Sequence, residues 1–238
     1  MIVALVACGA AVLGLVLLAG AGPLYRLGVL SLPNAFTLLR WAAYAGIAAI
    51  VLALAPAVLG YARGQRVVVL VASLALLGGA AAFGIPFQFQ QSARSLPPIH
   101  DITTDLDNPP VFEAVVPLRA ESPNSLERPP DLALQQREAY PDLAPVTLSM
   151  PADQAFDRAL AEAQDAGWRI VTADKGAGRI EATDTTRWFG FQDDVVVRLT
   201  QWGAGTRVDV RSVSRIGRGD VGTNARRIRR YLQALQDN

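Results

Sequence analysis

The chain's only histidine lies beside three aspartates in the stretch "PPIHDITTDLDNPPVF". An imidazole near carboxylates could bind a metal ion or exchange a proton with a substrate. The residues concerned are His100, Asp101, Asp105 and Asp107. One histidine supplies too few nitrogen ligands for an ordinary zinc site, and Pro109 and Pro110 interrupt the pattern of a calcium loop. We therefore expect no metal and no catalytic residue here, and the alternative is a carboxylate- or metal-dependent hydrolase that uses these four residues.

A second group combines arginines and glycines in "RSVSRIGRGDVGTNARRIRR", residues 211–230. Glycines allow the backbone to approach a ligand closely, and a helix start with nearby arginines suits a phosphate, a carboxylate or a lipid headgroup. The predicted anion site consists of Arg211, Arg215, Arg218, Gly219, Asp220, Gly222 and Thr223. The alternative is a structural turn, in which Asp220 caps the helix and the arginines pair with acids of the domain or of the preceding segment.

Other catalytic groups are scarce. The chain has no G-x-S-x-G motif and no Walker phosphate-binding motif, and Cys8 lies inside an apolar run. A thiol nucleophile is therefore excluded, and the residues require no cofactor. We expect a protein that is not an enzyme.

Residues 1–90 form the predicted membrane anchor. Residues 1–95 contain five arginines and no acid, whereas the rest of the chain carries seventeen basic and 21 acidic residues. Three apolar runs predict transmembrane helices over about residues 2–22, 36–59 and 66–86. Their lipid-facing sides would contact the membrane lipids. Arg63 and Arg66 occupy a very short loop, which favours a cytoplasmic loop and a soluble part on the outside, in the periplasm of a bacterium.

Residues 91–149 contain ten of the chain's 15 prolines and lack sustained periodicity. Because proline fixes φ and disfavours helix in the residue before it, we expect an extended tether, with one short helical turn around 131–138. Residues 150–238 predict a helix, four strands and a closing helix from about 221 to 236. In "GAGTRVDVRSVS", Val208 and Val210 should face the core and Arg207, Asp209 and Arg211 the outside. The predicted architecture is a three-helix transmembrane region followed by an α+β domain, an antiparallel four-stranded sheet with flanking helices.

Three stretches resemble the domain-of-unknown-function 1499 family over about residues 96–236. They are "PPIHDITTDLDNPPVF", "GWRIVTADKGAGRIEATDTTRWFGFQDDVVVRL" and "VDVRSVSRIGRGDVGTNARRIRRYL", in the order typical of that family. The resemblance implies a bacterial or plastid-related envelope setting and no specific activity. The predicted protein is thus a multi-pass protein of the bacterial inner membrane, whose periplasmic domain binds a protein partner in the envelope or an anionic ligand. Nucleic acid is not an expected partner, because the soluble part is net acidic.

Overall fold

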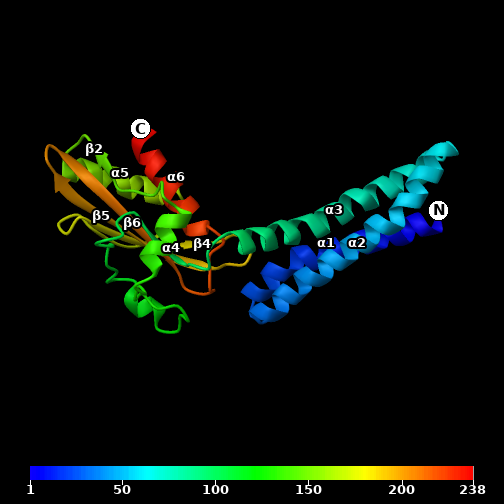
Figure 1. Cartoon of the computed structure of the whole chain (residues 1–238), viewed down its shortest axis with the longest axis horizontal. Helices are drawn as coiled ribbons and strands as arrows, with labels where there is room; N and C mark the ends of the chain where they lie inside the picture. The colour runs from blue at the N-terminus through cyan, green and yellow to red at the C-terminus, as the bar shows by residue number, and fades with distance from the viewer. Residues whose placement is uncertain (238) are drawn as a thin grey trace. The chain divides into compact units, whose positions relative to one another are not determined.

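The computed structural model describes residues 1–237 and divides into two compact units (Figure 1). One unit comprises Met1–Ser92 together with Arg187–Gly190, and the other comprises Ala93–Thr186 and the residues from Phe191 onward. The last residue of the predicted soluble domain, 238, lies outside the described residues.

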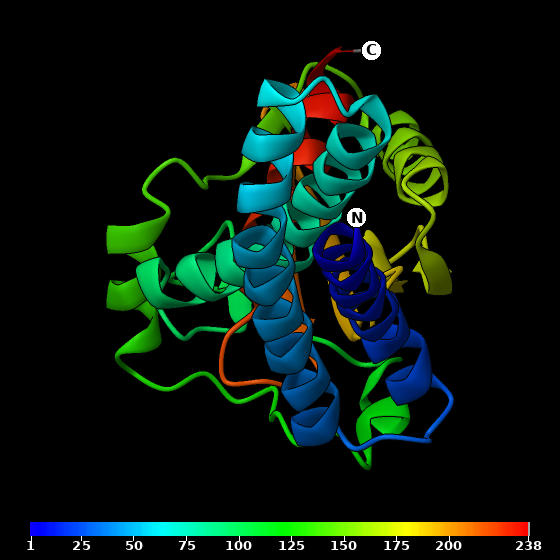
Figure 2. The same ribbon diagram turned by 90° about the vertical axis from the view of Figure 1, so that its right-hand side faces the viewer.

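Three long apolar helices form the first unit, and Figure 2 shows them side by side. They are α1 (Ile2–Arg26), α2 (Leu32–Ala62) and α3 (Arg66–Ser95). Each is long and apolar enough to cross a membrane, so the three predicted apolar helices are confirmed. All three helices extend beyond the predicted bounds in at least one direction, because helical backbone continues past the most apolar stretch. At Gly46 and Gly79 the backbones of α2 and α3 approach so closely that a Cβ on Gly46 would lie 2.6 Å from the Gly79 carbonyl oxygen. Only glycine fits this crossing point.

The second unit is built on an antiparallel sheet of six strands, rather than the four predicted. Its strands are β1 (Asp101–Thr103), β2 (Val146–Leu148), β3 (Arg169–Asp174), β4 (Arg179–Thr185), β5 (Gln192–Trp202) and β6 (Gly205–Ser214). The order is β1-β6-β5-β4-β3, and β2 also pairs with β6. The two additional strands come from the segment predicted to be an extended tether. They were missed because a strand of three residues is too short to show alternation.

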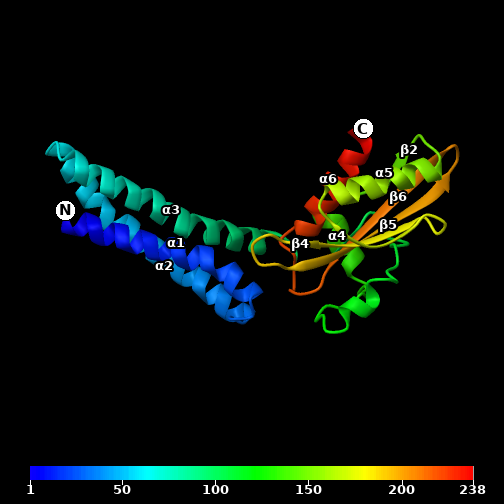
Figure 3. The ribbon, with the colours of Figure 1, turned by 180° about the vertical axis from the view of Figure 1, so that it is seen from behind.

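Two helices cover one face of this sheet, as Figures 1 and 3 show. They are α5 (Ala152–Asp165) and α6 (Thr223–Asp237). Alternate residues of β5, such as Val195 and Val197, join the core between the sheet and these helices. Val208 and Val210 of β6 lie in the same core, as the alternating pattern predicts. The α+β class is therefore confirmed, with a larger sheet than expected.

Part of the proline-rich segment, around Phe112 and Val115, covers the opposite face, whereas Leu132 and Tyr140 of the same segment join the main core. The segment contains the short 3-10 helix η1 (Val116–Arg119) and α4 (Leu132–Ala139), the latter at the predicted position. Phe112 and Val115 pack against Val196 of β5 and Val213 of β6 in a second, smaller apolar cluster. This cover explains why charged residues on that face are buried instead of solvated.

Candidate functional site

The two sequence motifs that could carry chemistry lie next to each other in the fold. Strand β1 pairs with β6, so that Asp101 lies opposite Val213 and Thr103 lies opposite Arg211. The pairing extends beyond β1, because the amide of Ser214 donates to the His100 carbonyl oxygen at 2.9 Å. The amide of Asp220 likewise donates to the carbonyl oxygen of Ile99. The histidine motif and the arginine-rich turn therefore form one continuous structure, which we call the motif joint (residues 99–105 and 211–224).

Arg211 is buried in the motif joint and pairs with Asp101. Its Nε and Nη2 atoms donate to the two carboxylate oxygens at 3.0 and 2.8 Å, a bidentate arrangement. Arg128 donates to the same carboxylate at 2.7 Å, and burial lowers the pKa of Arg128 although Asp101 opposes this shift. The remaining donors of Arg211 reach the carbonyl oxygens of Pro110 and Leu126. Its charge is thus neutralised inside the domain.

Arg215 is held in the same way by Asp194. Two donors of Arg215 reach the two carboxylate oxygens, each at 2.9 Å, and Arg119 donates to Asp194 at 2.6 Å. The hydroxyl of Thr183 donates to this carboxylate at 2.8 Å. Burial by itself would raise the pKa of Asp194, but the hydrogen bonds from Arg215, Thr183 and Arg119 outweigh it and lower the pKa.

Asp220 closes the start of α6. Its two carboxylate oxygens accept hydrogen bonds from the backbone amides of Gly222 at 2.8 Å and Asn224 at 2.7 Å. Burial raises the pKa of Asp220, and these two backbone hydrogen bonds act in the opposite direction. The intervening Val221 has a φ of 52°, a conformation that costs energy for a β-branched residue. Two amides at the beginning of α6 are therefore occupied by the protein's own carboxylate.

The remaining arginine of the predicted site, Arg218, is exposed, and among the described residues its side chain has no ion-pair partner. The turn that carries it packs on the residues that follow α3: the Cβ position of Gly219 lies 3.0 Å from Pro98, and that of Gly222 lies 3.1 Å from Leu96. The Nη1 atom of Arg226 lies 3.0 Å from the same Gly222 position. Arg94, two residues before Leu96, is also exposed. We call Arg94, Arg218 and Arg226 the basic end of the domain. Thr223, at the first position of α6, accepts a hydrogen bond from Arg226.

The four residues of the alternative metal site are directed to different partners. Asp105 binds Arg198 at 3.0 Å and Arg207 at 2.8 Å, whereas the carboxylate of Asp101 is taken by the arginines described above. Asp107 is exposed, and the Nδ1 atom of His100 lies 3.4 Å from the Arg218 carbonyl oxygen. In residues 1–237, no group of three or more histidines, cysteines and acidic residues is placed to hold a metal ion. A pocket of about 350 Å³ is lined in part by His100, Glu127 and Asp131.

Several residues that hold the motif joint together could not be selected from the sequence. Gln136 of α4 donates to the Thr103 carbonyl oxygen at 2.5 Å and accepts from the Thr103 amide at 3.1 Å. Asn224 donates to the His100 carbonyl oxygen and to the Ser214 hydroxyl, both at 3.0 Å. An amide side chain on a short or arginine-rich helix is normally solvated, so nothing in the pattern distinguishes these two. Arg119 and Arg128 could have been noticed in the sequence, because they are basic residues in a segment that contains mostly acidic charges.

Comparison with known proteins gives one match. The sequence model of the family described as Protein of unknown function (DUF1499) matches residues 101–235, which begins at the first residue of β1 and ends in α6. No match was found among curated proteins or among solved structures. The matched region contains residues 101–105 and 211–224 of the motif joint and most of the proline-rich segment.

Proposed function

The chain belongs to the DUF1499 family, and from the exposed arginines of the basic end we propose that it is a membrane-anchored protein whose soluble domain binds an anionic ligand at the membrane surface. The chemistry recognised would be a phosphate or carboxylate headgroup. Arg94, Arg218 and Arg226 would supply the positive charge, because Arg211 and Arg215 already bind buried carboxylates.

The observation that carries this proposal is the position of the unpaired arginines. Leu96 and Pro98 contact the turn that contains Arg218, and α3 ends at Ser95. An extended chain advances at most about 3.5 Å per residue, so Pro98 lies within roughly 10 Å of the end of the third membrane helix. Arginines that reach the membrane surface attract anionic headgroups, with a contribution of about 1 kcal/mol each.

The proposed setting is the bacterial inner membrane, with the soluble domain in the periplasm. Arg63 and Arg66 lie at the short turn between α2 and α3, and positive charge in short loops favours the cytoplasmic side. With three spans, the domain after α3 would then be outside. A reporter enzyme that is active only outside the cytoplasm, fused after Asn238, tests this orientation. An inactive reporter on a stably expressed fusion would show that the soluble domain lies in the cytoplasm.

Calorimetric titration of the full chain, in neutral detergent, with inorganic pyrophosphate tests whether the domain binds a phosphate-bearing anion. The double variant Arg218→Glu/Arg226→Glu should bind at least tenfold more weakly than the natural chain, because two favourable charges become unfavourable. Arg137→Glu is the matched control, since Arg137 is exposed on α4 and should leave binding unchanged. Equal binding by the double variant and the natural chain, with the fold intact, would refute the proposal.

A further inference from the structure

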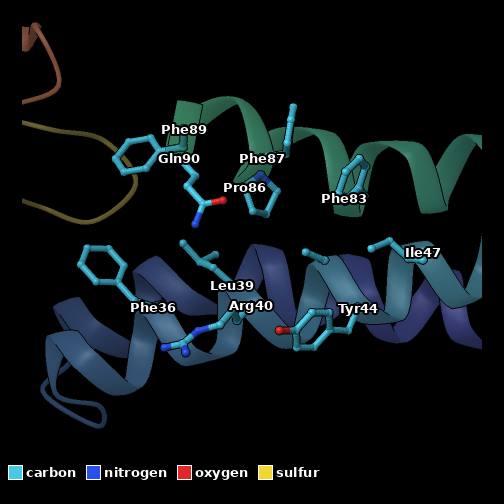
Figure 4. A pocket seen from close by; sticks show the side chains of 11 residues that line it. Phe36, Leu39, Arg40, Tyr44, Ile47, Phe83, Pro86, Phe87, Phe89 and Gln90 are labelled. Carbon is cyan, nitrogen blue, oxygen red and sulfur yellow. The ribbon is translucent and has the colours of Figure 1, made fainter. Parts of the chain in front are cut away.

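The membrane unit contains a pocket that the proposed function does not use. It has a volume of about 540 Å³ and lies between α2 and α3 (Figure 4), on the side of the Gly46–Gly79 crossing that leads to the end of α3. On the other side of the crossing, small side chains of the two helices, such as Ala49 and Ala75, pack together in an apolar cluster. Phe83, Phe87 and Phe89 of α3 and Phe36 of α2 line the space between them. The volume is within the range of about 300–1,000 Å³ that is typical of small-molecule pockets.

One cation lines this pocket. Arg40 is the only charged residue among its lining residues, and Tyr44 and Gln90 are the polar residues beside it. Figure 4 shows the hydroxyl of Tyr44 directed along α2 toward Arg40, and the amide of Gln90 directed from α3 toward α2. No acidic residue precedes Asp101 in the chain, so the membrane helices offer Arg40 no carboxylate. An exposed arginine without a carboxylate partner attracts anionic headgroups when it lies at the lipid surface, with a contribution of about 1 kcal/mol.

The depth of these groups matches the dimensions of a bilayer. From Trp41 to Tyr61, α2 rises about 30 Å, which equals the thickness of the hydrocarbon core, and both aromatic residues suit the interface. Arg40 therefore lies at the level of the lipid phosphates. Ile47, at the other end of the pocket, lies about 10 Å further into the apolar region. The pocket thus runs from a donor-rich end at the interface to a purely apolar end in the hydrocarbon core.

We propose that this pocket is a binding site for an anionic phospholipid of the surrounding bilayer. The phosphate would be bound by Arg40, with Gln90 and Tyr44 as further donors, and an acyl chain would follow the aromatic side chains toward Ile47. The argument is independent of the basic end of the soluble domain, because it uses none of the same residues.

The test uses the full chain reconstituted in phosphatidylcholine vesicles that contain a small fraction of spin-labelled lipid. Electron paramagnetic resonance measures how strongly the protein prefers spin-labelled phosphatidylglycerol to spin-labelled phosphatidylcholine. Arg40→Gln should lower this preference about fivefold, which is the contribution of one arginine at the lipid surface. Arg63→Gln is the matched control: Arg63 ends α2 at the opposite membrane surface, and its loss should have a smaller effect.

A second variant tests the apolar part without changing any charge. Ala43→Phe would fill the pocket beside Arg40 and should remove the phosphatidylglycerol preference to a similar extent. An unchanged preference in both Arg40→Gln and Ala43→Phe would overturn the proposal. An equal loss in Arg40→Gln and Arg63→Gln would also overturn it, because it would show general attraction of anionic lipid to arginine instead of a site.

Discussion

Replacement of Asp101 by asparagine should destabilise the soluble domain by about 3–5 kcal/mol. The substitution keeps the shape of the side chain and removes its charge. The side chain of Arg211 is 6% exposed and that of Asp101 is 3% exposed, so the guanidinium would be left charged and buried without a carboxylate. An ion pair exposed to solvent would contribute at most about 1 kcal/mol to stability. Because this pair is buried, we expect the larger loss that follows when one partner of a buried ion pair is removed.

Structural details favour the lower half of this range. Arg211 would keep its hydrogen bonds to the carbonyl oxygens of Pro110 and Leu126, and these dipoles compensate part of the charge. Arg128, the second partner of Asp101, is 13% exposed and can be partly hydrated after the change. We therefore expect a loss near 3 kcal/mol in Asp101→Asn. A second change, Arg211→Met, made in the Asp101→Asn chain should recover part of it, because the uncompensated charge is then removed.

Urea unfolding of the full chain in detergent, followed by tryptophan fluorescence, measures this loss. Trp168 reports on the domain core, where its ring stacks on Tyr231 with a centroid distance of 4.8 Å. Asp107→Asn is the control, because Asp107 is exposed in the same segment and its change should stay within about 0.5 kcal/mol. A loss below 1 kcal/mol in Asp101→Asn would refute the view that this ion pair fastens the proline-rich segment to the sheet.

Three further predictions concern Asp194, which binds Arg215, and the residues Asp220 and Val221 before α6. Each can be measured by the same urea-unfolding assay. Against the opposing effect of burial, the hydrogen bonds from Arg215, Thr183 and Arg119 lower the pKa of Asp194, so its ionised form stabilises the domain above the unfolded pKa of about 4. This contribution is lost as the pH falls from there through the lowered pKa of the folded state, and Asp194→Asn should therefore flatten the acid-induced decline of stability below about pH 4. Asp220→Ala should cost about 1 kcal/mol more than Asp220→Asn, because only asparagine keeps an acceptor for the amides at the start of α6. Val221→Gly should raise the free energy of unfolding by up to about 1 kcal/mol, because glycine tolerates a positive φ.

The assay separates these outcomes from their alternatives. An Asp194→Asn chain that keeps the full acid-induced decline would show that this carboxylate is not the group that titrates. Equal losses in the two Asp220 variants would show that its hydrogen bonds to the helix start contribute little. A destabilised Val221→Gly chain would mean that the packing of the valine side chain outweighs the relief of backbone strain.

Hydropathy and periodicity predicted the elements that are long enough to show a pattern. Several repeats of apolar residues are present in each of the three long apolar helices, in α5 and α6, and in the longer strands β4 to β6, so the positions of these elements follow from the sequence. Strands β1 and β2 have three residues each and exist because the free edge of β6 pairs with them. Their formation depends on pairing with residues far away in the chain, and the local sequence pattern does not predict such pairing.

The same limit applies to the predicted site. The alternation in β6 correctly separated Val208 and Val210 from Asp209 and Arg211, but the sequence did not show that the second face is also covered. Charged residues at alternate positions normally indicate a solvated face. Here Asp101 of the proline-rich segment neutralises Arg211, and Arg198 and Arg207 of the sheet itself neutralise Asp209. Ion pairs between distant segments leave only complementary charge in the sequence, and charge alone does not identify the partners.

The position of β6 has a consequence for how the protein is made. Strands β1 and β2 both pair with β6, which is synthesised after them, next to last among the elements of the chain. While the ribosome is still translating, the helices α1 to α3 can already form, but residues 101–148 have no strand to join. Pairings between segments so far apart in sequence form slowly. The domain must therefore complete its folding late, after translation has passed Ser214, and a chain that stops earlier would present an unpaired segment to proteases.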